Sequence, residues 1–498
     1  MDVRVKKGKA SREKTEALVA FFFEGTQRPE GILKVLDRSL SGKISALFRS
    51  GDAQGKPNEV SLLRTDDLIA APRLFLIGLG KRDQFKTDTF RQAAGTAAKV
   101  LKKYRLKEGT FLVETLPTQK FSPDVLGESV TEGIRLGAYS FDRYKTVQEE
   151  PKRKLETVTL LLERLTPVRM DRGVKVATTV TDSVNRVRNL ISEPSNEMTP
   201  SKLAAVSKEI GRKTKIKVTV LENAAIKKLG MGGLLGVSKA SPEGPRFIVM
   251  EYNLSQKRHP LFVFVGKGIT FDTGGISIMP SKGMDAMKYD MSGAAAVLGT
   301  LEAVARLKLP FRVVGLVPTC ENMPGGHAYK PGDILKALNG KTIEVLNTDA
   351  EGRLILADAL SYAKRYKPDG VVDLATLTGA CIIALGHFAI GLMTNNDRLA
   401  KRVTQAGESS GERVWELPLW EPYSELIKSE IADVKNIGDG TAGTITAAAF
   451  LKEFVDYPWV HLDIASRAWT EKELPYIPKG ATGIGVRLLV SFLRNWKR

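Results

Sequence analysis

The sequence predicts an α/β protein of two domains, of which the larger is built on a central mixed sheet flanked by helices. Short β-branched or aromatic runs alternate with amphipathic runs in the first third of the chain and again after residue 192. A charged helical pattern separates the two regions and ends at the breaker cluster of residues 192–196. The length of 498 residues, 43% of them hydrophobic, provides enough core material for two or more domains.

The first predicted domain comprises residues 1–165 and has an α/β pattern. Residues 18–23, 74–78, 110–114 and 155–162 are apolar and predict strands, whereas residues 90–104 have helical spacing and predict an amphipathic helix. The segment Gly78-Leu79-Gly80-Lys81 follows a predicted strand, but it lacks the third glycine or the Ser/Thr of a nucleotide-binding loop. A turn that ends the strand is therefore the favoured interpretation.

Residues 166–191 predict a linker helix, and residues 192–498 predict a larger second domain with a central mixed sheet. Expected strands lie near residues 217–221, 246–252, 261–265, 312–318, 342–346, 370–375 and 459–463, with helices near 293–307, 354–366 and 447–455. The apolar region 371–393 is about long enough to cross a membrane, but Asp373, glycines and His387 interrupt it. A strand, a loop and a second buried segment fit better, and no membrane association is expected.

Composition excludes several classes of site. The net charge of +19 is compatible with nucleic-acid binding, but Lys and Arg are interleaved with Asp and Glu, which favours a role in solubility. Two cysteines allow no disulfide framework and suit a reducing cytoplasm. The chain has four histidines and no H-E-x-x-H pair, so a histidine zinc-protease site is not expected.

The octapeptide N-T-D-A-E-G-R-L at residues 347–354 carries the first candidate chemistry. Asp349 and Glu351 follow the predicted strand, and in extended backbone two residues at this spacing face the same side. Paired carboxylates repel each other unless a cation or a proton lies between them, which favours a metal. Arg353 would lie at a helix N-terminus and form an anion site. The alternative is a solvated turn in which Arg353 only balances the acids.

A second acidic group lies upstream and strengthens the metal interpretation. Asp272 follows the predicted strand at residues 261–265, and Asp290 lies in the polar segment before the predicted helix at 293–307. Together with Asp349 and Glu351 these residues carry four negative charges, enough to neutralise two divalent ions. Oxygen ligands suit hard or borderline ions such as Mn²⁺, Mg²⁺ or Zn²⁺.

These segments resemble the leucyl (cytosol) aminopeptidases, peptidase family M17. The resemblance extends over nearly the whole chain, at residues 76–82, 189–200, 265–275, 284–296, 321–324, 330–333, 347–360, 375–379, 440–450 and 479–483. The octapeptide is its most specific part. The resemblance implies a metal-dependent aminopeptidase that removes N-terminal residues, with Leu preferred, from short peptides through a metal-bridging water. It also implies a homohexamer.

The same resemblance implies roles for individual residues. One metal site would be formed by Lys267, Asp272, Asp290 and Glu351, and the other by Asp272, Asp349 and Glu351, with Mn²⁺ or Zn²⁺ as the ions. Arg353 would hold a bicarbonate-like anion that acts as general base. The substrate side-chain pocket would be lined by Met287, Thr376, Gly379 and Ala481, for which a purely structural role in the core is the alternative.

One position departs from the family pattern. Seven residues after Asp272 the family has a second lysine, which helps to hold the substrate carbonyl, whereas this chain has Met279. Lys282 could supply the charge, although Pro280 constrains the backbone between the two positions. We therefore expect this protein to turn over its substrate more slowly than members of the family that have the second lysine. The rival hypothesis is a non-catalytic scaffold or a nucleic-acid-binding protein that kept the fold.

Overall fold

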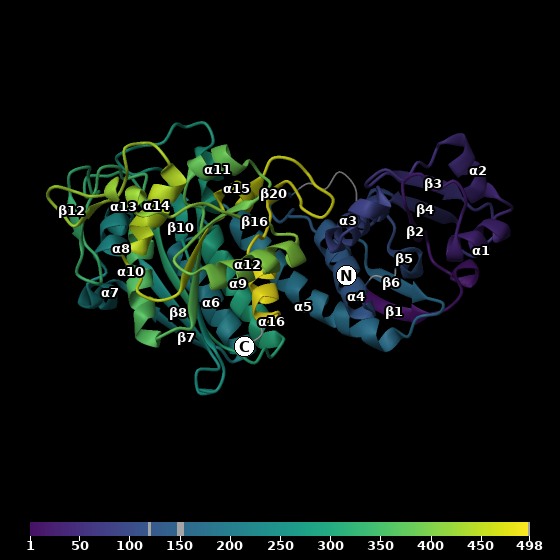
Figure 1. Cartoon of the computed structure of the whole chain (residues 1–498), viewed down its shortest axis with the longest axis horizontal. Coiled ribbons are helices and arrows are strands. Elements are labelled where there is room, and N and C mark those ends of the chain that lie inside the picture. Colours follow the sequence, from purple (N-terminus) through teal and green to yellow (C-terminus); the bar gives the residue numbers. More distant parts are fainter. Residues whose placement is uncertain (118–120, 147–153, 497–498) are drawn as a thin grey trace. The chain divides into compact units, whose positions relative to one another are not determined.

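The computed structural model describes residues 1–117, 121–146 and 154–496, which form two compact units. One unit consists of Met1–Asp182 with Lys472–Lys479, and the other consists of Ser183–Glu471 with Gly480–Arg498. The boundary lies within the long helix α5 (Pro167–Ser192). Both units contain a sheet with flanking helices (Figure 1), which confirms the predicted α/β class.

The N-terminal unit is built on a six-stranded sheet with strand order β1-β6-β5-β2-β4-β3. All neighbours are parallel except β3 and β4. The strands are β1 (Asp2–Lys7), β2 (Leu18–Phe22), β3 (Val60–Arg64), β4 (Arg73–Gly78), β5 (Glu108–Leu112) and β6 (Thr157–Leu162). The helices are α1 (Gly31–Ser39), α2 (Lys43–Ser50), α3 (Thr87–Lys103) and α4 (Pro123–Gly137), with 3-10 turns η1 (Ala10–Arg12), η2 (Arg82–Gln84) and η3 (Val113–Thr115).

Strand β2 shows why this sheet is covered on both faces. All five of its residues are buried. Val19 and Phe21 belong to the same core cluster as residues of α3 and α4, whereas Leu18 and Ala20 belong to the cluster that contains residues of α1 and α2. Because alternate residues of a strand point to opposite faces, an unbroken apolar strand needs helices on both sides.

The second unit contains a nine-stranded mixed sheet. Its order is β16-β15-β18-β14-β9-β11-β8-β7, and β10 pairs with β11. These strands are β7 (Lys217–Leu221), β8 (Arg246–Tyr252), β9 (Leu261–Gly266), β10 (Gly268–Asp272), β11 (Arg312–Asn322), β14 (Gly370–Ala375), β15 (Ile390–Thr394), β16 (Val414–Glu416) and β18 (Trp459–Asp463). The central strands β18, β14, β9 and β11 are parallel, so their carboxyl ends share one edge.

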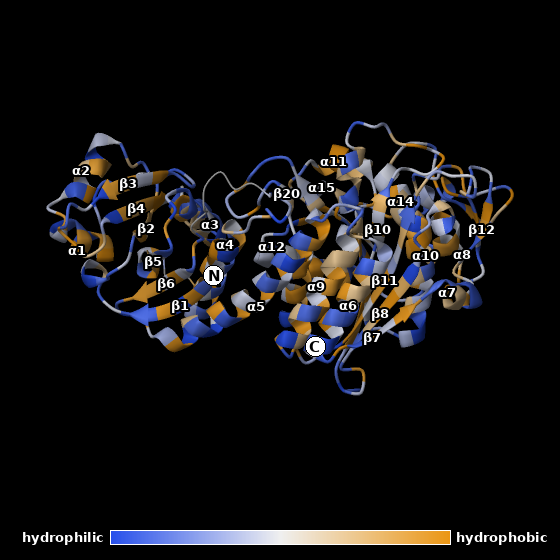
Figure 2. Ribbon diagram, turned by 180° about the vertical axis from the view of Figure 1, so that it is seen from behind, coloured by the Kyte–Doolittle hydropathy of each residue, from blue (hydrophilic) through white to orange (hydrophobic). Residues whose placement is uncertain are grey.

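Helices and short sheets complete the second unit. The helices are α6 (Pro200–Thr214), α7 (Asn223–Leu229), α8 (Gly232–Val237), α9 (Ser292–Arg306), α10 (Gly352–Ala363), α11 (Gly379–Leu385), α12 (Asp397–Ser410), α13 (Glu421–Glu425), α14 (Gly443–Lys452), α15 (Ala465–Ala468) and α16 (Val486–Arg494). The 3-10 segments are η4 (Ser238–Ala240), η5 (Met284–Met291) and η6 (Lys364–Tyr366). The strands are mostly apolar and the helices are polar on their outer sides (Figure 2). Among the described helices, none has the length and apolar character needed to cross a membrane.

One predicted strand lies in a different sheet from the one expected. Residues 342–346 were expected in the main sheet, but β13 (Thr342–Glu344) forms a separate three-stranded sheet with β12 (Ile334–Lys336) and β17 (Val434–Lys435). A further small sheet pairs β19 (Trp469–Thr470) with β20 (Gly480–Ala481). Local β-propensity does not specify a partner strand, which is why the sequence could not assign the sheet.

A buried carboxylate of α10 connects this helix to α8. Asp358 accepts hydrogen bonds from Leu234 N at 2.9 Å and Leu338 N at 2.8 Å, one on each carboxylate oxygen. Burial raises the pKa of Asp358 to about 7, against the opposing effect of these backbone donors.

We therefore predict that Asp358→Asn destabilises the protein by about 1–3 kcal/mol, because either amide orientation turns an NH₂ group toward a backbone N–H. Urea unfolding measures the loss. The exposed acid-to-amide control Glu430→Gln should leave the free energy of unfolding unchanged. Equal unfolding midpoints for Asp358→Asn and the parent would contradict the prediction.

Candidate metal centre

Lys267 lies in the one-residue gap between β9 and β10, at the carboxyl end of the central strands. Its N–H donates to Leu374 O at 3.0 Å, and its carbonyl accepts from Ala294 N at 2.8 Å, so β14 and α9 fix its backbone. Gly293 permits this close packing, since a Cβ there would lie 2.0 Å from Leu374 O. Lys267 is 3% exposed, and its side chain is therefore held in the protein interior.

The Lys267 ammonium lies among carboxylates. Its Nζ is 2.7 Å from Asp290 Oδ2, 2.8 Å from Glu351 Oε1 and 2.9 Å from Thr376 O. Asp272, Asp290 and Glu351 are all buried, and each offers an oxygen within 4.8 Å of the others. The structure thus brings together four of the five predicted metal ligands, although they come from four separate segments.

Neighbouring polar groups orient two of these carboxylates. Asp272 Oδ1 accepts from Gly274 N and from Asn322 Nδ2, both at 2.8 Å. Asp290 Oδ1 accepts from Thr376 Oγ1 at 2.6 Å. Thr376 therefore supports the cluster through its carbonyl and its hydroxyl. Side chains fixed in this way hold their remaining carboxylate oxygens in a set direction.

The cluster carries more negative than positive charge, and its pKa values reflect this. Burial opposes the ammonium form of Lys267, but Asp290 and Glu351 outweigh burial and raise the pKa of Lys267. Burial raises the pKa of Asp290 to about 7, against the opposing charge of Lys267. Burial, with the nearby charge of Glu351, also raises the pKa of Asp272 well above its usual value. Additional positive charge would stabilise the ionised carboxylates.

The donor set fits divalent cations. Asp290 Oδ2 and Glu351 Oε1 are buried and face the Lys267 ammonium at 2.7 Å and 2.8 Å. Carboxylate oxygens are the ligands that hard or borderline cations prefer. An amine and several carboxylates at one strand edge can therefore hold such ions.

Asp349 is placed differently from the sequence prediction. Thr348 and Asp349 form a turn, and Glu351 has helical backbone angles (φ −78°, ψ −35°) as the residue before α10. The expectation of extended backbone across these positions is therefore wrong. Asp349 lies outside the buried triad and is exposed, but partial desolvation of its carboxylate and the charge of Glu351 raise its pKa to about 6. Its Oδ1 also lies within 2.8 Å of where a Gly274 Cβ would be.

Arg353 lies in the first turn of α10, as predicted, and is 7% exposed. One guanidinium nitrogen donates to Asn436 O at 2.6 Å, whereas Nε has no hydrogen-bond partner among the described residues. Burial lowers the pKa of Arg353 to about 10, against the opposing charges of Glu351 and Asp463. The side chain remains a cation at neutral pH and retains a donor for an anion.

The four predicted pocket residues differ in their surroundings. Thr376 belongs to the metal-centre network described above. Met287 is half-buried in η5, and Gly379 is exposed at the start of α11, where a Cβ would meet no atom within 4 Å. Ala481 is buried in β20 and pairs with Trp469.

Two buried asparagines that support the site were not among the predicted site residues. Asn322 joins Asp272 to the loop of the octapeptide by donating also to Thr348 O at 3.0 Å. Asn436 accepts from Leu346 N at 2.8 Å and offers its own carbonyl to Arg353. A polar residue at the end of an apolar strand could have indicated Asn322, but no local pattern indicates Asn436.

The departure at Met279 lies on the loop that follows Asp272. Met279 N donates to Thr273 O at 2.9 Å, and the side chain is half-buried. Lys282 is exposed, and within the described part of the chain it has no hydrogen-bond or ion-pair partner. Within the described part of the chain, Lys282 therefore makes no contact that fixes its ammonium beside the carboxylate cluster.

An α/β unit with buried carboxylates and a lysine at the carboxyl ends of its central strands defines a protein equipped to hold divalent cations. Comparison with known proteins identifies it further. The family model for the cytosol aminopeptidase family, catalytic domain, matches residues 185–490, and the model for its N-terminal domain matches residues 18–148. The chain belongs to the cytosol aminopeptidase family and is an aminopeptidase.

Relatives and solved structures agree with this assignment. The probable cytosol aminopeptidase of Roseiflexus castenholzii is 48% identical over 463 residues, which cover 92% of this chain and 94% of the relative. That of Geotalea uraniireducens is 48% identical over 468 residues, 93% of each. A mutant of tomato leucine aminopeptidase has a TM-score of 0.89 at 35% identity and covers 99% of this chain and 97% of its own. The bottromycin maturation enzyme BotP in complex with Mn has a TM-score of 0.85 at 33% identity, and the match covers 96% of this chain and 99% of BotP.

Proposed function

We propose that this aminopeptidase is metal-dependent, uses two divalent ions, and removes N-terminal residues, with Leu preferred, from short peptides with a free amine. The buried cluster of Lys267, Asp272, Asp290 and Glu351 is the observation that carries the proposal. The similarity to a protein solved with Mn supports Mn²⁺ as one candidate ion, with Zn²⁺ as the other.

The ligand sets follow from the same cluster. One ion would be held by Lys267, Asp272, Asp290 and Glu351, and the second by Asp272, Asp349 and Glu351. When bound, the ions would supply Lewis acidity to the scissile carbonyl and would lower the pKa of the attacking water. Lys267 must lose a proton from Nζ to act as a ligand, because an ammonium has no free lone pair. The neighbouring carboxylates raise the pKa of Lys267 and oppose this loss, so the charge of the ions would have to favour it.

Arg353 is proposed to hold a bicarbonate-like anion that accepts a proton during the reaction. Three features support this role: the side chain is buried, its Nε lacks a partner among the described residues, and it lies in the first turn of α10. A guanidinium and free backbone N–H groups at a helix N-terminus favour an anion at the same place.

The preference for Leu rests on a pocket formed by Met287, Thr376, Gly379 and Ala481. The open space around Gly379 supports this assignment, because a side chain there would extend into free volume. Thr376 would both line this pocket and orient Asp290, to which its hydroxyl donates a hydrogen bond.

We also propose a homohexamer in the cytoplasm. Exposed apolar side chains on the second unit, including Ile383, Phe388 and Trp415, support burial against other copies. Both cysteines are free and buried, in accord with a reducing compartment.

A peptide panel tests the activity. With Mn²⁺ present we expect hydrolysis of Leu-p-nitroanilide and Leu-Gly, weaker hydrolysis of Cys-Gly, and no hydrolysis of N-acetyl-Leu-Gly, which lacks the free amine. EDTA should abolish turnover, and added Mn²⁺ or Zn²⁺ should restore it. Full activity after exhaustive metal removal, or equal cleavage of the acetylated peptide, would refute the proposal. Salt-sensitive DNA binding without any turnover would favour the nucleic-acid-binding rival instead.

A further inference from the structure

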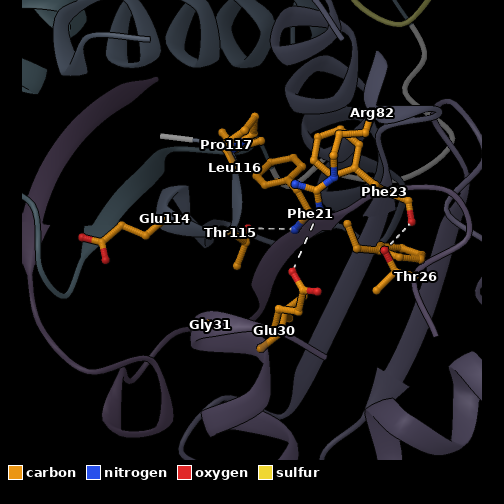
Figure 3. Close-up of a pocket in the computed structure, with 12 residues that line it drawn as sticks. Phe21, Phe23, Thr26, Glu30, Gly31, Arg82, Glu114, Thr115, Leu116 and Pro117 are labelled. Carbon is orange, nitrogen blue, oxygen red and sulfur yellow. Dashed lines mark hydrogen bonds and ion pairs between the residues drawn. The ribbon is translucent and has the colours of Figure 1, made fainter. Parts of the chain in front are cut away.

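The N-terminal unit contains a cavity of about 330 Å³ beside the carboxyl ends of two neighbouring strands (Figure 3). One wall comes from the end of β2 and the loop to α1, and includes Phe21, Phe23 and Glu30. The other comes from η3 and the residues after it, including Leu116, while Arg82 closes the side next to β4. None of these residues belongs to the metal centre.

The position of the cavity follows from the topology of the sheet. After β2 the chain leads through α1, α2 and β3 to β4 on one side, whereas after β5 it leads through α4 to β6 on the other side. β2 and β5 are adjacent and parallel, so their outgoing connections diverge. In open α/β sheets such a divergence leaves a crevice at the carboxyl ends of the strands, which is where ligands bind.

Two oppositely charged side chains in the cavity are available to a ligand. Arg82 lies over the Phe23 ring at 4.4 Å, and its guanidinium is 4.0 Å from Glu30 Oε2. Their side chains are 63% and 81% exposed, so this contact is weak in water. Figure 3 shows the two side chains extending toward each other.

The remaining polar side chains of the cavity are already engaged. Glu114 points away from Arg82 (Figure 3), and its Oε1 accepts from three backbone N–H groups at residues 163–165. Thr115 Oγ1 donates to Leu112 O at 2.7 Å and accepts from Phe21 N at 2.9 Å. Thr26 donates to Phe23 O at 2.7 Å. A ligand would therefore meet one positive charge, one negative charge and an apolar floor.

We propose that this cavity binds a free α-amino acid with an apolar side chain. Its carboxylate pairs with Arg82, its ammonium pairs with Glu30, and its side chain packs on Phe21, Leu33 and Leu116. A zwitterion satisfies both charges, whereas a phosphate dianion would be repelled by Glu30.

The inference goes beyond the proposed catalytic function. Free amino acids are what an aminopeptidase releases, so the cavity would bind the product class through residues that are not part of the metal centre. The ligand contacts only residues of the N-terminal unit, and binding requires no metal ion and no turnover.

Equilibrium dialysis of radiolabelled L-leucine against the EDTA-treated full chain tests the proposal. We expect saturable binding of one leucine per chain, weakened at least about tenfold by Arg82→Gln and by Glu30→Gln. Lys81→Gln, which removes an adjacent exposed charge outside the cavity, should leave binding unchanged. Both altered side chains are mostly exposed, so unfolding midpoints should match the parent and exclude misfolding.

Leucine analogues test whether the cavity recognises both charged groups of the amino acid. Leucinamide lacks the carboxylate and N-acetylleucine lacks the ammonium, so each should bind at least about tenfold more weakly than leucine. No leucine binding, or leucine binding unaffected by both variants, would overturn the inference, as would Arg82-dependent binding of inorganic phosphate in place of leucine. Arg82-dependent binding in a protein that fails the peptide assay would leave this inference standing and overturn the proposed function alone.

Discussion

Met279→Lys is expected to raise kcat by about 10²–10³ while KM changes little. Met279 follows the proposed metal ligand Asp272 on a loop whose backbone is anchored by the hydrogen bond from Met279 N to Thr273 O. An ammonium introduced here would stabilise negative charge that develops on the substrate carbonyl oxygen. Such an interaction acts mainly in the transition state, and its gain therefore appears in kcat.

Two variants serve as controls for this prediction. Met279→Leu keeps the size without adding charge and should leave kcat unchanged. Lys282→Ala should also change little, because Lys282 is exposed and has no hydrogen-bond or ion-pair partner among the described residues. Steady-state kinetics on Leu-p-nitroanilide in Mn²⁺ gives the comparison. Loss of activity in Lys282→Ala, together with no gain in Met279→Lys, would show that Lys282 already supplies the charge.

Glu351→Gln is expected to lower kcat/KM by about a thousandfold or more, on the order of 4 kcal/mol in transition-state stabilisation. Glu351 is 1% exposed, and its Oε1 lies 2.8 Å from Lys267 Nζ. Both proposed metal sites share this carboxylate. The amide has almost the same size but no charge, so both sites lose affinity for cations.

Metal content after dialysis distinguishes a shared ligand from a ligand of one site. We expect two ions per chain in the parent, one in Asp349→Asn and fewer than one in Glu351→Gln, as measured by elemental analysis. The unfolding midpoint in EDTA shows whether either variant has lost its fold. Two tightly held ions and full turnover in Glu351→Gln would rule out the bridging role.

The sequence by itself determined the local elements and the residue types of the site. The alternation of strand-like and helical runs in the second domain predicted a sheet covered by helices, and helical spacing in the first domain predicted α3. The octapeptide placed Arg353 at a helix start because Gly352 lets the chain turn before an apolar helical run. These features depend on neighbours within a few residues, and periodicity reports such neighbours directly.

Only the tertiary structure decided which groups meet. Asp290 reaches Lys267 from η5, and Glu351 reaches it from the start of α10. Asn436 reaches Arg353 across 83 positions of sequence. The cavity beside Arg82 requires the order of strands in the N-terminal sheet, which no local pattern specifies. Contacts between distant segments depend on how whole helices and strands pack. Hydrophobic burial determines which faces turn inward, but it is not directional. A short stretch of sequence therefore does not specify which other element it will contact.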